Sequence, residues 1–229
     1  MGRIDEIIDS FLVFKINNNI EKQVELIIRE YCRDTFYRVL NNGLMNSELD
    51  EAIAYFSSRL MYSLNSYGLK NNRYSQKYEK ELFRGVRLPY TNILKFKQSI
   101  GEVILFKQFT STAVEKEIAI IFSRIKDSHS FYKTNKRFSV IFTIRNLFKD
   151  SWVSNGVNIT HINPYTYGTG EILFLPFSFF YIKDVYIDNN NYTAEILLET
   201  IGKHEILEEK IKLGKEIKFN KNDCLMIIK

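Results

Sequence analysis

The sequence predicts an α+β fold, because helices come first along the chain and strands follow. Up to about residue 78, apolar residues recur every three or four positions, which is the spacing of amphipathic helices. From residue 79 onwards they alternate or run in short clusters, which is typical of strands, with one helical segment between them. This order differs from the regular strand–helix alternation of a doubly wound sheet. We therefore expect one integrated domain, with a helical subdomain at residues 1–78 packed on a β core at residues 79–229.

The composition is that of a globular protein large enough to bury a core. The chain has 229 residues, of which 45% are hydrophobic and 26% charged. A chain of this size buries roughly 70% of its unfolded surface. Its apolar runs are shorter than the ~18 residues of a membrane span, and Asp5 and Glu6 stand where a secretion signal would be apolar. We expect a cytoplasmic protein without a membrane span.

The net charge of +5 is spread along a chain that is rich in lysine throughout. Aromatic and basic residues do not form the clustered signature of a nucleic-acid-binding surface. We therefore do not expect the protein to bind nucleic acid, although a nucleic-acid-binding module is the alternative that the charge leaves open. We also expect a monomer. Cys32 and Cys224 lie far apart in sequence, and we expect both to be free thiols in a reducing compartment. The Cys and His spacings do not suit a metal site.

Three helices are predicted in the helical subdomain, on apolar stripes at residues 4–14, 24–39 and 53–64. The second helix should end near Asn42-Gly43, where a glycine follows the stripe. Asn46 or Ser47 can cap the third helix, which we expect to stop at Gly68. None of these helices gathers His or acidic residues on an apolar face, so we interpret them as scaffold.

The β core is predicted to contain strands, one helix and the turns that connect them. A mixed segment with Ile93, Leu94 and Phe96 follows the first strand, and Gly101 marks a turn. Asn155-Gly156 marks another turn, and the C-terminal residues suggest a closing hairpin. The helix is expected at residues 113–124. The strands are expected at residues 81–86, 103–112, 138–145, 171–175, 179–188 and 192–200.

Three polar elements of this core offer chemistry. Arg84 lies in a strand directly before Gly85, where a guanidinium can hold a phosphate or carboxylate through two hydrogen bonds. Ser111 belongs to a run of hydroxyl residues at a strand end, for which the N-cap of the next helix is the alternative interpretation. Glu171 has aliphatic residues on its C-terminal side only, so we expect it at the mouth of a strand. Taken singly, each has an ordinary structural explanation.

Taken in this order, the three elements resemble the mono-ADP-ribosyltransferases of the arginine–serine–glutamate class. Phe83-Arg84-Gly85-Val86 is similar to that family's aromatic-Arg-Gly strand, and Phe109-Thr110-Ser111-Thr112 is similar to its Phe-x-Ser-Thr-Ser strand. Residues 171–176 are similar to its last catalytic strand, and residues 37–44 to the helical segment before the arginine. The resemblance covers roughly residues 20–200. It implies a split, mostly antiparallel β core with NAD in a cleft.

The resemblance also implies that the protein cleaves NAD and transfers ADP-ribose to an acceptor protein, without a metal. Arg84 would hold the phosphates and ribose, and Gly85 would offer its backbone to the nicotinamide carboxamide. Ser111, with Thr112 beside it, would contact NAD and orient Glu171. Glu171 would bind the 2′-hydroxyl of the nicotinamide-side ribose and stabilise the positive charge that develops there. Many members are toxins or effectors, so export into a host cell without a cleaved N-terminal signal is the alternative location.

The departures from the family pattern concern the acceptor. Arginine-modifying members carry an acid two residues before the catalytic one, where this chain has Thr169, which is not a base. NAD glycohydrolysis, with water as the acceptor, is therefore the alternative activity. Tyr165 and Tyr167, in the loop that corresponds to the target-recognition turn, either contact the acceptor or pack locally. Ala113 replaces the last serine of the Ser-Thr-Ser element, and His161 is a candidate substitute base.

Overall fold

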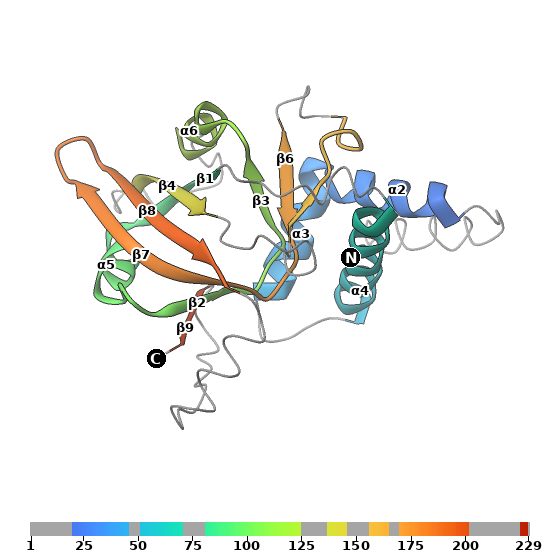
Figure 1. Ribbon diagram of the computed structural model, residues 1–229, viewed down its shortest axis with the longest axis horizontal. Coiled ribbons are helices and arrows are strands. Elements are labelled where there is room, and N and C mark those ends of the chain that lie inside the picture. Colours follow the sequence, from blue (N-terminus) through green and yellow to red (C-terminus); the bar gives the residue numbers. More distant parts are fainter. Residues whose placement is uncertain are drawn as a thin grey trace.

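The computed structural model describes residues 20–45, 51–70, 81–124, 137–145, 156–164, 170–201 and 225–228. Figure 1 shows helices that precede the strands and lie beside them, which confirms the predicted α+β fold. Outside the described residues lie the helix predicted at residues 4–14, both candidate caps of the third helix, and the boundary between residues 78 and 79, which stays a prediction. The elements are, in order, α2 (Ile20–Tyr31), α3 (Asp34–Met45), α4 (Glu51–Lys70), β1 (Leu82–Pro89), α5 (Tyr90–Gln98), β2 (Val103–Phe106), β3 (Thr110–Ala113), α6 (Lys116–Arg124), β4 (Arg137–Arg145), β5 (Gly156–Asn158), β6 (Glu171–Phe174), β7 (Ser178–Asp188), β8 (Thr193–Thr200) and β9 (Leu225–Ile228).

The helix predicted at residues 24–39 is in fact two helices, so the prediction of one continuous helix was wrong. α2 and α3 meet at Cys32 and Arg33, where the Arg33 carbonyl oxygen accepts a hydrogen bond from the Phe36 N–H over 2.9 Å. The apolar spacing continues across this break because both helices bury a face in the same hydrophobic cluster. The third predicted helix, α4, does not stop at Gly68 but continues to its end at Lys70.

The segment at residues 103–112, predicted as one strand region, contains two strands that belong to different parts of the sheet. β2 pairs with β7 and β9, whereas β3 pairs with β6 and β1. The mixed segment that follows β1 is helix α5, in which Ile93 and Phe96 are buried. At the C-terminus, β9 adds a strand at the edge of the sheet, beside β2.

The strands form a mostly antiparallel sheet in the order β5-β6-β3-β1-β4-β8-β7-β2-β9, and among the described strands β4 and β8 alone pair in parallel. β1 pairs with β4 along its whole length, but with β3 at a single position, Phe83 opposite Ala113. Beyond this pair the sheet is split into a smaller half, β5-β6-β3, and a larger half, β1-β4-β8-β7-β2-β9. The split core that the resemblance implied is therefore confirmed.

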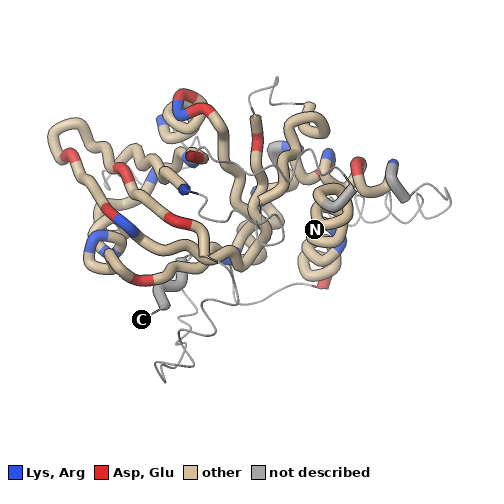
Figure 2. The backbone as a smooth tube through the Cα atoms, viewed as in Figure 1, with Lys and Arg blue, Asp and Glu red and all other residues tan. Residues whose placement is uncertain are grey.

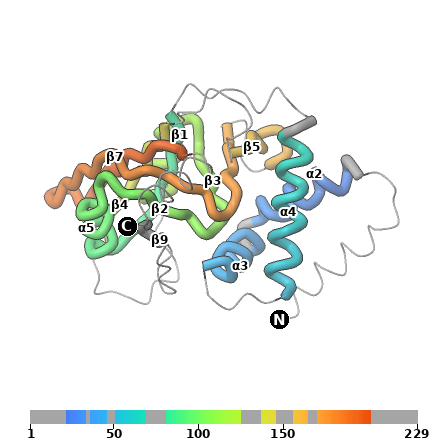
Figure 3. The backbone as a smooth tube through the Cα atoms, turned by 60° about the horizontal axis from the view of Figure 1, so that its bottom comes forward, coloured from blue at the N-terminus to red at the C-terminus, as the bar shows by residue number. Residues whose placement is uncertain are grey.

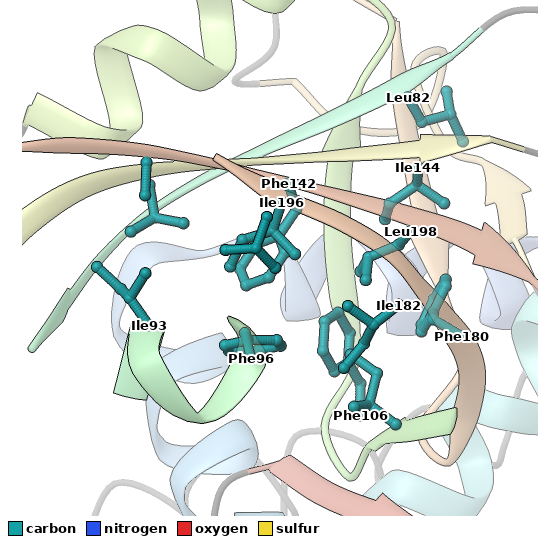
Figure 4. Packing of buried hydrophobic residues seen from close by; sticks show 14 of the residues in the cluster. Leu82, Ile93, Phe96, Phe106, Phe142, Ile144, Phe180, Ile182, Ile196 and Leu198 are labelled. Atoms are coloured by element: carbon teal, nitrogen blue, oxygen red, sulfur yellow. The ribbon is translucent and has the colours of Figure 1, made fainter. Parts of the chain in front are cut away.

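Each half of the sheet has its own hydrophobic core. The larger half and α5 enclose side chains that Figure 4 shows from close by, among them Leu82, Ile93, Phe96, Phe106, Phe142, Ile144, Phe180, Ile182, Ile196 and Leu198. The second core lies between the smaller half and the helices α2, α3 and α4, which lie beside it in Figures 1 and 3. β6 contributes to both cores, because Ile172 and Phe174 belong to the first and Leu173 to the second.

The described chain carries charges of both signs along its length. Lys and Arg are interspersed with Asp and Glu along it in Figure 2, whereas a nucleic-acid-binding surface gathers its basic residues on one face. That the chain does not bind nucleic acid stays a prediction. None of the described helices is both long enough and apolar enough to cross a membrane.

Candidate active site

The pairing of β3 with β6 brings Ser111 and Glu171 together on one face of the smaller half. Glu171 lies opposite Ala113 and Ser111 lies opposite Leu173, so Ser111 and Glu171 are diagonal neighbours on the same face. The Ser111 hydroxyl donates a hydrogen bond to Glu171 Oε1 over 2.5 Å. Leu173 belongs to the core beneath the helices, so this face is turned toward α2, α3 and α4. The N-cap interpretation of Ser111 is wrong, because α6 begins only at Lys116.

Thr112 lies on the other face of β3. Strand alternation turns its side chain away from Ser111, and its hydroxyl donates to the carbonyl oxygen of Ile172 over 2.8 Å. The structure thus brings Ser111, but not Thr112, to Glu171. Ala113, which stands in place of the family's last serine, lies directly opposite Glu171 in the β3–β6 pair. Its methyl group cannot donate a hydrogen bond to the carboxylate.

Arg84 reaches Ser111 across the split in the sheet. β1 and β3 separate after the pair of Phe83 and Ala113, and Arg84 Nη1 donates to the backbone carbonyl oxygen of Ser111 over 2.8 Å. The guanidinium therefore gives this carbonyl group the partner that a continued β1–β3 ladder would have given it. Arg84, Ser111 and Glu171 form one hydrogen-bonded series that joins β1, β3 and β6.

Both carboxylate oxygens of Glu171 accept a hydrogen bond. Ser111 donates to Oε1, and Asn163 Nδ2 donates to Oε2. The backbone of Glu171 is held as well: its N–H donates to Thr160 Oγ1 over 2.8 Å, and its carbonyl oxygen accepts from the Ile159 N–H over 3.0 Å. The segment that follows β5 therefore holds both the main chain and the side chain of Glu171, and the carboxylate has a defined orientation.

Burial and charge act against each other in this site. Burial raises the pKa of Glu171, whereas the hydrogen bonds from Ser111 and Asn163 and the charge of Arg84 oppose the increase. Burial likewise lowers the pKa of Arg84 from its usual value, and two tyrosines of α2 and α3 together with Glu171 oppose the decrease. The guanidinium stays protonated in any case. The site thus holds a cation and an acid that favour each other's charged forms in a region shielded from water.

Two glycines of the site are required by the backbone. A Cβ atom on Gly85 would lie 1.7 Å from the carbonyl oxygen of Ala119, so a side chain would force α6 away from β1. Gly170, directly before Glu171, has a φ of 69°, which favours glycine, and its carbonyl oxygen accepts from the Val114 N–H over 3.0 Å. Close packing with α6 thus explains Gly85, and its contact with the carboxamide stays a prediction.

Three residues near the site were not singled out from the sequence. Asn163 contacts Glu171 directly, and Asn41 and Tyr31 belong to helices that were interpreted as scaffold. Asn41 did leave a signal, because a polar residue stands beside Leu40 in the middle of a buried helical stripe, where such residues are rare. For Asn163 the sequence offers no comparable signal.

Other predicted residues are not brought to the site or cannot be placed. Tyr165, Tyr167 and Thr169, predicted for acceptor recognition, lie outside the described residues, and so does the second cysteine. Cys32 is a free thiol, and His161 is exposed. Within the described ranges, His, Cys, Asp and Glu do not gather in groups of three that could hold a metal ion.

The structure is similar to solved ADP-ribosyltransferases, although no protein-family model and no curated protein matches the sequence. The Vis toxin, an ADP-ribosyltransferase from Vibrio splendidus, has a TM-score of 0.61 at 18% identity, over 89% of this chain and 87% of that one. Exoenzyme S from Pseudomonas aeruginosa, in complex with human 14-3-3 protein beta and bound to carba-NAD, has a TM-score of 0.54 at 18% identity, over 86% of this chain and 88% of that one. Plx2a, an ADP-ribosyltransferase toxin from Paenibacillus larvae, has 0.54 at 12% identity, over 79% and 86%. This chain therefore has the fold of the ADP-ribosyltransferases.

Proposed function

We propose that the protein cleaves NAD between nicotinamide and ribose and transfers the ADP-ribose to a side chain of an acceptor protein. The observation that carries this proposal is the hydrogen-bonded series of Arg84, Ser111 and Glu171 at the split of the sheet. These are the residues to which the resemblance assigns the chemistry, and they come from three strands that are far apart in sequence. The similarity to toxins leads us to propose a host cell as the setting.

Glu171 has the environment for stabilising a positive charge that appears only in the transition state. As nicotinamide leaves, the ribose becomes electron-poor, and a nearby carboxylate stabilises this state more than it stabilises bound NAD. Ser111 and Asn163 fix the direction of the carboxylate beforehand, which is how preorganised charge acts in catalysis. Each carboxylate oxygen can accept more than one hydrogen bond, so Glu171 can bind the 2′-hydroxyl of the ribose in addition.

Arg84 has the chemistry for binding the diphosphate of NAD. One of its N–H groups is committed to the Ser111 carbonyl oxygen, and a guanidinium has five such donors in a fixed plane, which suits phosphate oxygens. Its charge is permanent, so it attracts an anionic substrate at any physiological pH. Gly85 follows in the same strand, and we assign to its backbone the carboxamide of the nicotinamide.

A Glu171→Gln variant tests the proposal, because it keeps the size of the side chain and removes its charge. We expect nicotinamide release from NAD to fall by about 10²–10³-fold. Glu195→Gln is the matched control, since it removes an exposed carboxylate of β8 that pairs with Lys116 over 2.6 Å, and it should release nicotinamide at the wild-type rate. Unchanged release from the Glu171 variant would show that this carboxylate is not catalytic.

The same assay, run with labelled NAD and cell lysates, separates transfer from hydrolysis. Label on lysate proteins supports the transferase. Release of nicotinamide in several lysates without labelled protein indicates NAD glycohydrolysis instead. We also expect no transfer to agmatine, a guanidinium compound with which the Vis transferase has been solved, because Thr169 offers no base to accept its proton.

A further inference from the structure

A buried polar cluster connects the helices to the strand that carries Ser111. Tyr31 of α2 is 3% exposed and Asn41 of α3 is 8% exposed. Asn41 Nδ2 donates to the Phe109 carbonyl oxygen over 3.2 Å, and Asn41 Oδ1 accepts from the Phe109 N–H over 3.1 Å. Phe109 leads into β3, and the Tyr31 ring packs on the Phe109 ring with centroids 5.3 Å apart. The cluster therefore adjoins the face of β3 on which Ser111 meets Glu171.

The two bonds with Phe109 decide the orientation of the Asn41 amide. A backbone N–H needs an oxygen as its partner and a backbone carbonyl needs an N–H, so the oxygen and nitrogen ends of Asn41 cannot be exchanged. Asn41 consequently directs an N–H toward Tyr31, whose hydroxyl oxygen accepts it over 3.2 Å. A hydroxyl that accepts a hydrogen bond from this side directs its own proton elsewhere.

Among the described residues, nothing accepts the Tyr31 hydroxyl proton. Besides the neighbouring Cys32, the groups whose charge acts on Tyr31 are Glu171 and Arg84 of the site. Arg84 can only donate hydrogen bonds, and the side chains that donate to the Glu171 carboxylate in the described part of the chain are Ser111 and Asn163, not Tyr31. Burial raises the pKa of Tyr31, so the phenol keeps this proton at neutral pH. A buried donor without an acceptor is unfavourable, and a ligand oxygen would remove that penalty.

We propose that Tyr31 is a substrate-binding residue that donates its hydroxyl proton to a sugar or phosphate oxygen of NAD. The inference rests on the proposed function, because it requires the dinucleotide to lie along Arg84 and Glu171. Asn41 is the positioning residue in this arrangement: it holds Tyr31 by the hydroxyl and the start of β3 by the Phe109 backbone. The helices thereby form one wall of the binding site in addition to supporting it.

The test is a Tyr31→Phe variant titrated with carba-NAD, the carbocyclic analogue of NAD whose bond to nicotinamide is stable. The variant keeps the aromatic packing on Phe109, and Asn41 retains both of its bonds to the Phe109 backbone, so we expect an unchanged fold. Loss of one hydrogen bond should raise the Kd about tenfold. Tyr55→Phe is the matched control, since it removes an exposed hydroxyl of α4 that accepts from Arg59 over 3.3 Å, and its Kd should equal that of the wild type.

The outcomes separate this inference from the proposed function. If the wild type binds carba-NAD and Tyr31→Phe binds it within twofold of the wild type, Tyr31 does not contact the substrate and only this inference is overturned. If the wild type neither binds carba-NAD nor releases nicotinamide from NAD, both are overturned. Titration with ADP shows which part of NAD carries the oxygen that accepts the hydrogen bond from Tyr31. If Tyr31→Phe loses as much affinity for ADP as for carba-NAD, the bond belongs to the adenosine diphosphate part. If it loses affinity for carba-NAD alone, the bond belongs to the nicotinamide-side ribose.

Discussion

Both halves of the sheet bury apolar side chains, and they differ in the hydrogen-bonded polar groups that accompany them. The larger half encloses an apolar core in which phenylalanine rings touch one another, as Phe106 and Phe180 do with centroids 4.9 Å apart. The smaller half and the helices also hold polar groups that bond across elements, among them the buried Asn41 and the half-buried Ser111 and Glu171. Apolar burial stabilises a fold directly, whereas buried polar groups must be paired to avoid destabilising it. This contrast leads us to expect stability from the larger half and chemistry from its junction with the smaller one.

The largest change in stability should come from Phe180→Ala, which removes a buried aromatic ring from the core of the larger half. Phe180 is 0% exposed, and its ring also lies 5.4 Å from that of Phe174. We expect the free energy of unfolding to fall by about 3–5 kcal/mol, since the substitution leaves a cavity, and urea denaturation measures this. Tyr186→Ala, on the same strand but 66% exposed, should change it by no more than about 0.5 kcal/mol. Equal effects of the two substitutions would mean that the larger half is not the source of stability.

Two strands of the larger half are predicted closely by the sequence. Alternating apolar residues predicted β4 from residue 138, a strand was also predicted from residue 179, and the structure begins β4 and β7 at Arg137 and Ser178. Regular alternation is local information, which a single sequence contains. In the smaller half, the position of Glu171 at the start of β6 was predicted for an equally local reason, because aliphatic residues follow it but do not precede it.

The rest of the site depends on contacts that local patterns do not contain. Asn163 meets Glu171 because the chain turns back between β5 and β6, and the spacing of apolar residues does not predict this contact. The break between α2 and α3 was hidden because both helices bury a face in one cluster. Strand alternation alone would have separated Thr112 from Ser111, whereas the resemblance placed them together.

Glu171→Gln should lower activity and also change how the free energy of unfolding depends on pH. The pKa of Glu171 is raised from its usual value of 4.5, so the folded protein holds this proton more tightly than the unfolded chain. The stability that this protonation contributes is present below about pH 4.5 and is lost as the pH rises through the higher value in the folded state. The Gln variant does not titrate, so its stability relative to the wild type should increase between pH 4 and pH 8.

Urea unfolding of both proteins across this pH range measures the change, and Glu195→Gln controls for the loss of a carboxylate at an exposed position. If the stability of Glu171→Gln relative to the wild type decreases with rising pH, the hydrogen bonds from Ser111 and Asn163 lower the pKa of Glu171 by more than burial raises it. In that case the smaller half would be stabilised by its polar groups, and the contrast between the halves would not hold.

The smallest expected effect is a shift in the pH profile of nicotinamide release in Asn163→Ala. It tests whether a single hydrogen bond in the smaller half changes the pH at which Glu171 is active. In Asn163→Ala, Glu171 loses one of the two side-chain hydrogen bonds that oppose the effect of burial on its pKa. The carboxylate then takes up a proton at a higher pH, so the acidic limb of nicotinamide release should move to higher pH. Above that limb the rate should fall less than in Glu171→Gln, because the charge remains and Ser111 still orients it.

Asn191→Ala is the matched control for this shift, since Asn191 Nδ2 also donates to a carboxylate oxygen, that of Asp188, over 2.8 Å. That pair lies at the exposed turn between β7 and β8 in the larger half, so its removal should leave the pH profile unchanged. An acidic limb that stays in place in Asn163→Ala would show that this bond only anchors the loop. A limb that moves in Asn163→Ala alone would show that the same kind of hydrogen bond affects catalysis in the smaller half, where it meets a buried acid, and not at the surface.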